Sequence, residues 1–159
     1  MQRQGGSSLG MISMSGKFFL DTNILIYTFD PDSPGNRKIA LDLVQRALST
    51  GQGMISYQVI QEFLNVATRK FTRPLSFSDC RIYLYRVLSP LCAVFPSFDF
   101  YDRGLDIADR YGYGLYDSLI ISAALAGGCS TLFSEDLQHG QKIRELIIIN
   151  PFISPAQKT

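Results

Sequence analysis

The sequence contains one histidine, His139, and three widely spaced cysteines, Cys80, Cys92 and Cys129. A catalytic triad or a histidine metal site would have to rely on His139 alone, and no cysteine pair has the spacing of a zinc site. The odd number of cysteines favours a reducing compartment, so we expect a cytoplasmic protein. No apolar run approaches the roughly 18 residues that span a membrane, and we expect no membrane association.

The sequence also lacks an excess of charge of one sign. Its 159 residues include 15 Lys or Arg and 14 Asp or Glu, which gives a formal net charge of +1. This balance excludes a strongly polybasic nucleic-acid coat. With 46% hydrophobic and 18% charged residues, the chain does not have the composition of a disordered protein. We divide it into an extension or tag at residues 1–16, one domain at 17–153 and a tail at 154–159.

Short apolar segments alternate with amphipathic ones along the chain. We predict strands at residues 17–21, 54–57, 92–95, 130–134 and 145–149. We predict helices at residues 22–27, 36–50, 58–70, 78–88, 98–111 and 118–126, with Pro90 ending the fourth, and a turn or short helix at 135–140. The strands are apolar throughout, which is typical of a parallel sheet covered by helices on both faces. We therefore expect an α/β fold with a mostly parallel sheet of about five strands.

Four acidic residues are expected at one edge of this sheet. Asp21 ends the first strand, Glu62 lies in the first turns of the helix after the second strand, and Asp136 follows the fourth strand. Asp117 opens the helix that leads into the fourth strand. Because parallel strands end at a common edge, where ligands of such sheets bind, we expect the four side chains to converge there.

Converging carboxylates repel one another, and a divalent cation relieves the repulsion. Oxygen ligands favour Mg²⁺ or Mn²⁺. Such an ion polarises a phosphoryl oxygen and lowers the pKa of a bound water, which allows phosphodiester hydrolysis without a histidine or serine nucleophile. Our leading hypothesis from these residues is therefore a metal-dependent nuclease.

Each acid also has an ordinary structural explanation. An Asp at a strand end often forms a turn or a helix cap, and Asp117 suits the positive end of a helix dipole. Two other functions stay open: a phosphatase that uses Asp21 as a covalent nucleophile, and a catalytically silent module that binds metal or nucleic acid. The phosphatase would need a lysine near the site, and none lies near the end of a predicted strand.

A second group of acids falls at helical spacings of three and four, with Arg103 and Arg110 between them. Its members are Asp99, Asp102, Asp106 and Asp109. We interpret this group as an exposed helix face with ion pairs, not as a metal site. We expect His139 at the surface or in packing.

Several motifs, taken in order, resemble the PIN-domain family, and in particular the VapC-type toxins of type II toxin–antitoxin modules. The motifs are Phe19-Leu-Asp-Thr-Asn23, Gln61-Glu-Phe63, the segment Tyr116–Ala124 and the segment Leu132–Gly140. The match covers Lys17 to Pro151. It implies an α/β/α sandwich, an Mg²⁺- or Mn²⁺-dependent endoribonuclease whose products carry a 5′-phosphate, a homodimer, and a cognate antitoxin.

The resemblance also assigns residues. Metal-binding and catalytic roles fall to Asp21, Glu62, Asp117 and Asp136. Thr22, Asn23 and Ser134 match positions that orient the carboxylates or waters. After Asp136, Leu-Gln-His-Gly replaces the more usual acid followed by Phe, so the adjacent Glu135 is an alternative fourth acid.

Basic and aromatic residues near the acids are candidates for RNA binding. Arg69, Lys70 and Arg73 form the densest basic group, which either contacts phosphates or interacts with the dipole of its helix. Tyr113 and Tyr116 flank Asp117, and either stack on unpaired bases or pack in the protein.

The helix at residues 79–88 is a candidate dimer or antitoxin face through its apolar residues, which are Tyr83, Leu84, Val87 and Leu88. If the four acids occupy one site, basic residues outnumber acidic ones over the rest of the chain. We therefore expect RNA binding to strengthen when Mg²⁺ is added.

Overall fold

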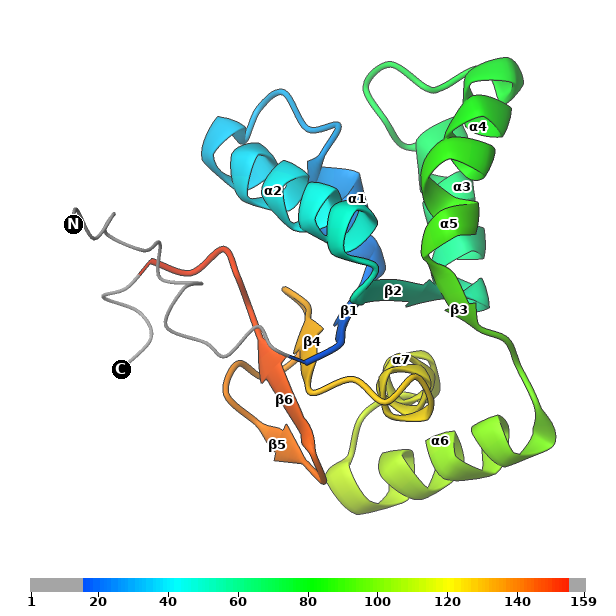
Figure 1. The fold of residues 1–159 in the computed structure, drawn as a ribbon, viewed down its shortest axis with the longest axis vertical. Helices are drawn as coiled ribbons and strands as arrows, with labels where there is room; N and C mark the ends of the chain where they lie inside the picture. Colours follow the sequence, from blue (N-terminus) through cyan, green and yellow to red (C-terminus); the bar gives the residue numbers. More distant parts are fainter. Residues whose placement is uncertain (1–15, 155–159) are drawn as a thin grey trace.

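The computed structural model describes residues 16–154, which form a six-stranded sheet with the order β3-β2-β1-β4-β6-β5 (Figure 1). All neighbouring strands are parallel except β5 and β6. The strands are β1 (Phe18–Leu20), β2 (Gly53–Ser56), β3 (Cys92–Val94), β4 (Thr131–Phe133), β5 (Lys142–Ile143) and β6 (Leu146–Ile149). The mostly parallel sheet is confirmed. The expected extension and tail lie, apart from one residue of each, outside the described residues.

The sheet has one strand more than the sequence predicted. β5 is two residues long and runs antiparallel to β6. A tight turn connects the two strands, and Arg144 in this turn adopts a φ of 53°. A strand this short carries no periodic signal in the sequence. The predicted turn or short helix at residues 135–140 forms turns and bends and no helix.

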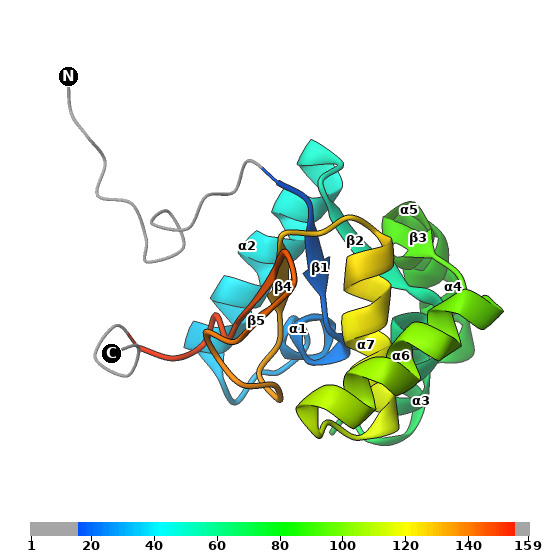
Figure 2. The same ribbon diagram turned by 90° about the horizontal axis from the view of Figure 1, so that it is seen from below.

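Helices cover both faces of the sheet, and the predicted α/β/α sandwich is confirmed (Figure 1). One face carries α1 (Thr22–Tyr27), α2 (Pro34–Thr50), α3 (Tyr57–Arg69), α4 (Phe77–Tyr83) and α5 (Ser89–Leu91). On the other face α7 (Leu115–Ala126) packs against the strands and α6 (Phe98–Tyr111) packs against α7 (Figure 2). Among the described residues, no helix has both the length and the apolar character needed to cross a membrane.

Four helices begin earlier than the sequence predicted: α3 and α4 by a single residue, and α2 and α7 by more. α2 begins at Pro34 and not at Asn36, because the fixed φ of proline suits the first turn of a helix, where no N–H partner is needed. α7 begins at Leu115, so Asp117 lies in its first turn and does not open the helix. α6 has the predicted bounds and ends at Gly112, whose φ of 75° is a left-handed conformation that glycine adopts without strain.

The segment predicted as a single helix at residues 78–88 is longer and irregular. Between α4 and α5 lies a π-helical segment, η2 (Leu84–Leu88), in which the N–H of Ser89 donates to the carbonyl of Leu84. Pro90 falls in the first turn of α5, directly after this segment, and the helix continues past it instead of ending there as predicted.

The apolar residues of that segment, which we expected at a partner face, pack largely against the chain itself. Leu88 is fully buried, and Tyr83, Leu84 and Val87 pack against the core of the chain itself. The ring of Tyr83 stacks on that of Phe63, with centroids 4.8 Å apart. Leu88 is therefore not available to a partner, whereas Tyr83, Leu84 and Val87 are partly exposed, so the partner face stays a prediction for these three.

The sheet has a switch point at β1. From β1 the chain continues through α2 to β2 on one side, whereas β4 pairs with β1 on the other. Leu20 of β1 pairs with Phe133 of β4, so the two strands end side by side. In open parallel sheets, ligands bind in the crevice beyond the strand ends at such a point.

Candidate metal centre

Asp21 follows β1 at the switch point, and its side chain is buried with 6% exposure. Its backbone N–H donates to the carbonyl of Phe133 at 3.0 Å, which fixes the end of β1 against the end of β4. One carboxylate oxygen accepts a hydrogen bond from the N–H of Thr22 (2.7 Å), and the other accepts one from the hydroxyl of Ser134 (2.7 Å). The carboxylate is therefore held in one orientation by the two strand ends.

Glu62 reaches the same region from the second turn of α3. Its Oε2 accepts a hydrogen bond from the hydroxyl of Thr22 (2.7 Å), and its Oε1 accepts one from the side-chain amide of Gln58 (2.8 Å). The same Gln58 amide nitrogen donates to the backbone carbonyl of Tyr116 (3.2 Å), the residue before Asp117. Gln58 thus connects Glu62 to the first turn of α7.

Asp136 lies in the segment after β4. Its Oδ2 accepts a hydrogen bond from the amide of Asn23 (3.1 Å), which is also 3.5 Å from both Asp21 and Ser134. Its backbone N–H donates to the hydroxyl oxygen of Ser134 (3.2 Å). The three residues predicted to orient the acids, Thr22, Asn23 and Ser134, therefore all contact acidic residues of the predicted site.

Glu135 has a different set of partners. Its carboxylate accepts a hydrogen bond from the hydroxyl of Tyr27 (2.8 Å), while its backbone N–H donates to Asn23 (3.3 Å). The charges that act on Asp21 come from Glu62 and Asp136, not from Glu135. The geometry thus favours Asp136 over Glu135 as the fourth acid.

The pKa values show that the four predicted acids interact. The pKa of Asp21 is raised to about 6, mainly by burial and further by the charges of Glu62 and Asp136. The hydrogen bonds from Ser134 and Thr22 act in the opposite direction and lower it. Asp117 is exposed, but partial desolvation and the charges of Asp136 and Glu62 also raise its pKa. The structure therefore brings together all four acids singled out in the sequence, and among residues 16–154 no cation offsets their charges at Asp21.

This donor set fits a hydrated magnesium ion. Within residues 16–154, no three acidic, histidine or cysteine side chains are close enough together to hold one metal ion between them. Mg²⁺ does not require such a cage, because it keeps several waters and is often bound through one or two carboxylates. Asp21 with one neighbouring acid can bind the ion directly, and the remaining acids can bind its waters.

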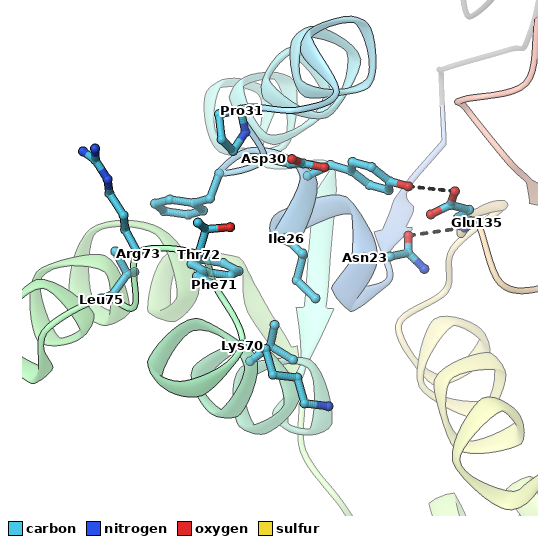
Figure 3. A pocket seen from close by; sticks show the side chains of 13 residues that line it. Asn23, Ile26, Asp30, Pro31, Lys70, Phe71, Thr72, Arg73, Leu75 and Glu135 are labelled. Carbon is cyan, nitrogen blue, oxygen red and sulfur yellow. Dashed lines mark hydrogen bonds between the residues drawn. The ribbon is translucent and has the colours of Figure 1, made fainter.

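A groove of about 640 Å³ opens beside the acids. Asn23 and Glu135 line the part that borders the acidic site, and Lys70 and Arg73 lie on the wall made by the end of α3 and the segment after it (Figure 3). Most of the remaining lining is apolar, and it includes Ile26, Phe29, Val66, Phe71 and Leu75. Arg69, predicted together with Lys70 and Arg73, is exposed but does not line the groove.

The two tyrosines before Asp117 have different environments. Tyr113 is half-buried, and its hydroxyl bonds to the side chain of Gln141, so it packs in the protein. Tyr116 is 70% exposed and is free to contact a ligand.

The remaining polar residues singled out in the sequence lie outside the site. Asp106 forms an i,i+4 ion pair with Arg110 at 3.0 Å on the exposed face of α6, as expected, and Arg144 lies 3.7 Å from Asp106. His139 is half-buried, and its Nδ1 accepts a hydrogen bond from the N–H of Asn150 (3.0 Å), which is a packing role.

Two residues of the site were not predicted from the sequence, Gln58 and Tyr27. Both act through long side chains that reach across elements, so their partners depend on how α3 and α1 are placed. The only sequence signal for Gln58 is its position one helical turn before Glu62, which brings the two side chains to the same face of the helix.

The fold and the acids at its switch point agree with a family comparison. The model of the PIN domain family matches residues 18–143, and the chain therefore belongs to this family. Among curated proteins, no sequence matches the chain.

Three solved structures with similar folds come from toxin–antitoxin systems. A toxin–antitoxin complex from Klebsiella pneumoniae has a TM-score of 0.61 and 20% identity, and the match covers 86% of this chain and 98% of that one. VapC20 of Mycobacterium tuberculosis, named as a toxin that cleaves the sarcin–ricin loop, has a TM-score of 0.54 and 15% identity. That match covers 76% of this chain and 92% of VapC20. VapBC2 of Rickettsia felis, bound to promoter DNA, has a TM-score of 0.55 and 20% identity, and the match covers 82% of this chain and 96% of that one.

Proposed function

We propose that this protein is a metal-dependent endoribonuclease and the toxin of a toxin–antitoxin pair. The observation that carries the proposal is the placement of Asp21, Glu62, Asp117 and Asp136 beside one another at the switch point, with raised pKa values at Asp21 and Asp117. Membership of the PIN domain family and the toxin–antitoxin origin of the similar structures support the same conclusion.

Bound Mg²⁺ or Mn²⁺ would polarise a phosphoryl oxygen of RNA and lower the pKa of the water that attacks phosphorus. Asp21 contributes a buried carboxylate that is held in one orientation, because both of its oxygens accept hydrogen bonds. Thr22 and Gln58 orient Glu62, and Asn23 orients Asp136. Lys70 and Arg73 carry positive charge along the groove beside the acids, where they contact phosphates of the RNA strand.

The phosphatase alternative has less support. A covalent aspartyl nucleophile needs a nearby cation to meet the charge of the phosphoryl group, and among the described residues no cation affects the pKa of Asp21.

We also propose that the protein forms a homodimer, that an antitoxin protein inhibits it, and that it acts in the cytoplasm. Free Cys80, Cys92 and Cys129 are consistent with a reducing compartment. Light scattering of the dilute protein tests the first of these statements, and a monomer would contradict it.

The nuclease proposal is tested with Asp21→Asn. We expect the wild-type protein to cleave a mixture of cellular RNAs in Mg²⁺, to leave 5′-phosphates, and to lose the activity in excess EDTA. Asp21→Asn should be inactive while keeping its circular dichroism spectrum. Asp106→Asn, on the exposed face of α6, is the matched control and should stay active. Full activity of Asp21→Asn, or of the wild type in EDTA, would falsify the proposal.

A further inference from the structure

A second cleft, of about 320 Å³, lies at the same edge of the sheet as the acids. It is lined by the end of β2, the start of α3, the segment after β3, and the starts of α6 and α7. Its lining contains no charged residue, and four of its members are aromatic residues with exposed rings: Tyr57, Phe95, Tyr101 and Tyr116.

These rings are unusually open to solvent. Phe95 is 65% exposed and Tyr116 is 70% exposed, while Tyr57 and Tyr101 are 46% and 45% exposed. The rings of Tyr57 and Phe95 lie with their centroids 6.4 Å apart. Exposed aromatic faces gathered around a cleft indicate a ligand that stacks on them.

Ser56 gives the cleft an unsatisfied polar group. The residue is 2% exposed, and its hydroxyl is the one buried side-chain polar atom without a hydrogen-bond partner among the described residues. Buried polar groups in native proteins are nearly always paired, and a missing partner calls for an explanation. A small rotation of the hydroxyl would let it donate to, or accept from, a polar atom of a bound ligand.

The cleft borders the acidic site directly. Gln58 lines the cleft and donates hydrogen bonds to both Glu62 and the carbonyl of Tyr116. Tyr116 also lines the cleft and precedes Asp117 in α7. A group bound in the cleft is therefore next to two of the four acids.

We propose that this cleft binds a nucleobase of the RNA strand, adjacent to the phosphate that the acidic site cleaves. The inference rests on the proposed function. The neutral lining does not suit a phosphate, whereas the aromatic rings suit an uncharged, planar base. The Ser56 hydroxyl and the Gln61 amide supply partners for the polar edge of the base, and the cleft has a volume near the lower end of the roughly 300–1,000 Å³ of small-ligand sites.

The test measures the binding of the four uncharged nucleosides, adenosine, guanosine, cytidine and uridine, by NMR of the Phe and Tyr rings in the absence of metal. At least one nucleoside should shift the ring signals of Phe95, Tyr101 and Tyr116. Phe95→Ala and Tyr116→Ala should each weaken that binding by about tenfold, the loss expected for one stacked ring. Ser56→Ala should change the preference among the four nucleosides.

Tyr85→Ala is the matched control, because Tyr85 is 72% exposed but lies in η2, outside the cleft. Absence of ring shifts with all four nucleosides, or an equal loss in Tyr85→Ala, overturns the inference. A second copy of the chain is the competing occupant. If sedimentation shows a wild-type dimer that Phe95→Ala converts to a monomer, the cleft is a dimer interface and the inference is wrong.

Failure of this inference is distinguishable from failure of the proposed function. Nucleoside binding is read without metal and without cleavage, so it does not depend on nuclease activity. If Asp21→Asn abolishes RNA cleavage but no nucleoside binds, only the base cleft is rejected. If nucleosides bind but Asp21→Asn remains active, the nuclease proposal is rejected and the base-binding cleft stands as a site for some other nucleotide-containing ligand.

Discussion

Thr22 donates hydrogen bonds to two acids of the site at once. Its backbone N–H lies 2.7 Å from Asp21 Oδ1, and its hydroxyl lies 2.7 Å from Glu62 Oε2. Because Thr22 is the first residue of α1, it ties the strand that carries Asp21 to the helix that carries Glu62. One residue therefore sets the relative position of two carboxylates.

Replacing Thr22 with valine should weaken metal use without unfolding the protein. The substitution keeps the shape of the side chain and the N–H, but it leaves Glu62 without its hydroxyl partner. We expect activity at limiting Mg²⁺ to fall by about 10-fold or more, as is common for residues that orient metal ligands. Thr22→Ser should retain most of the activity, since it keeps the hydroxyl. Equal activity of Thr22→Val and the wild type across a Mg²⁺ titration would contradict this prediction.

Gln58 should act in the same way from the other side of Glu62. Gln58→Ala removes the hydrogen bond to Glu62 and the bridge to the carbonyl of Tyr116. We expect the Mg²⁺ concentration for half-maximal activity to rise by about tenfold. Gln45→Ala, on the exposed face of α2, is the control and should leave the Mg²⁺ titration unchanged. An unchanged titration in Gln58→Ala as well would mean that this residue does not position the acid.

The identity of the fourth acid can be decided by two neutral substitutions. Asp136 accepts a hydrogen bond from Asn23, and its charge raises the pKa values of Asp21 and Asp117. The Glu135 carboxylate instead accepts a hydrogen bond from Tyr27. Asp136→Asn should therefore reduce RNA cleavage by about a hundredfold, and Glu135→Gln by no more than about threefold. The reverse ranking would identify Glu135 as the ligand and show that the Tyr27 hydrogen bond breaks when metal binds.

Local patterns in the sequence were sufficient to predict most of this fold. The strand that precedes Asp21 is apolar throughout because β1 lies in the middle of the sheet, between β2 and β4. The bounds of α6 were predictable because Ser97 caps its start and Gly112 ends it. The PIN-like order of motifs added the sandwich architecture, which the family match confirms.

The features that the sequence did not reveal depend on long-range packing. β5 forms only because the chain turns back along β6, and the helix continues past Pro90 directly after η2. Tyr83 was expected in a partner-binding face, but it is half-buried and its ring packs against those of Phe29 and Phe63. Likewise, nothing local to Gln58 or Tyr27 indicates that their partners are Tyr116 and Glu135.

Stability in the absence of metal should depend on pH through Asp21. Its pKa is about 6 in the folded protein against 3.8 for an unperturbed aspartate, so the folded state holds the proton more tightly. The stabilising effect of this proton is present below about pH 4 and is lost as the pH rises through 6. Asp21→Asn has no such loss. The margin by which its free energy of unfolding exceeds that of the wild type should therefore be about 2 kcal/mol larger at pH 7 than at pH 4.

Urea denaturation of both proteins in EDTA, at several values between pH 4 and pH 7, measures this difference. Added Mg²⁺ should reverse the ranking at pH 7 by stabilising the wild type alone, since ligand binding to the folded state raises its stability. A difference that stays constant between pH 4 and pH 7 would show that burial does not perturb Asp21.

The basic wall of the groove should contribute to RNA binding through phosphate contacts. Lys70 and Arg73 line the groove beside the acids, whereas Arg46 is exposed on α2 and does not. Each phosphate contact to a single strand contributes about 0.7 to the slope of the logarithm of affinity against the logarithm of salt concentration. Lys70→Ala and Arg73→Ala, each in the Asp21→Asn background to prevent cleavage, should therefore bind a single-stranded RNA more weakly and with a slope smaller by about 0.7. Arg46→Ala should match the parent protein in both respects. If all three substitutions reduce the RNA affinity and its salt dependence equally, RNA binding depends only on the overall charge of the protein. The RNA strand then does not bind along the groove.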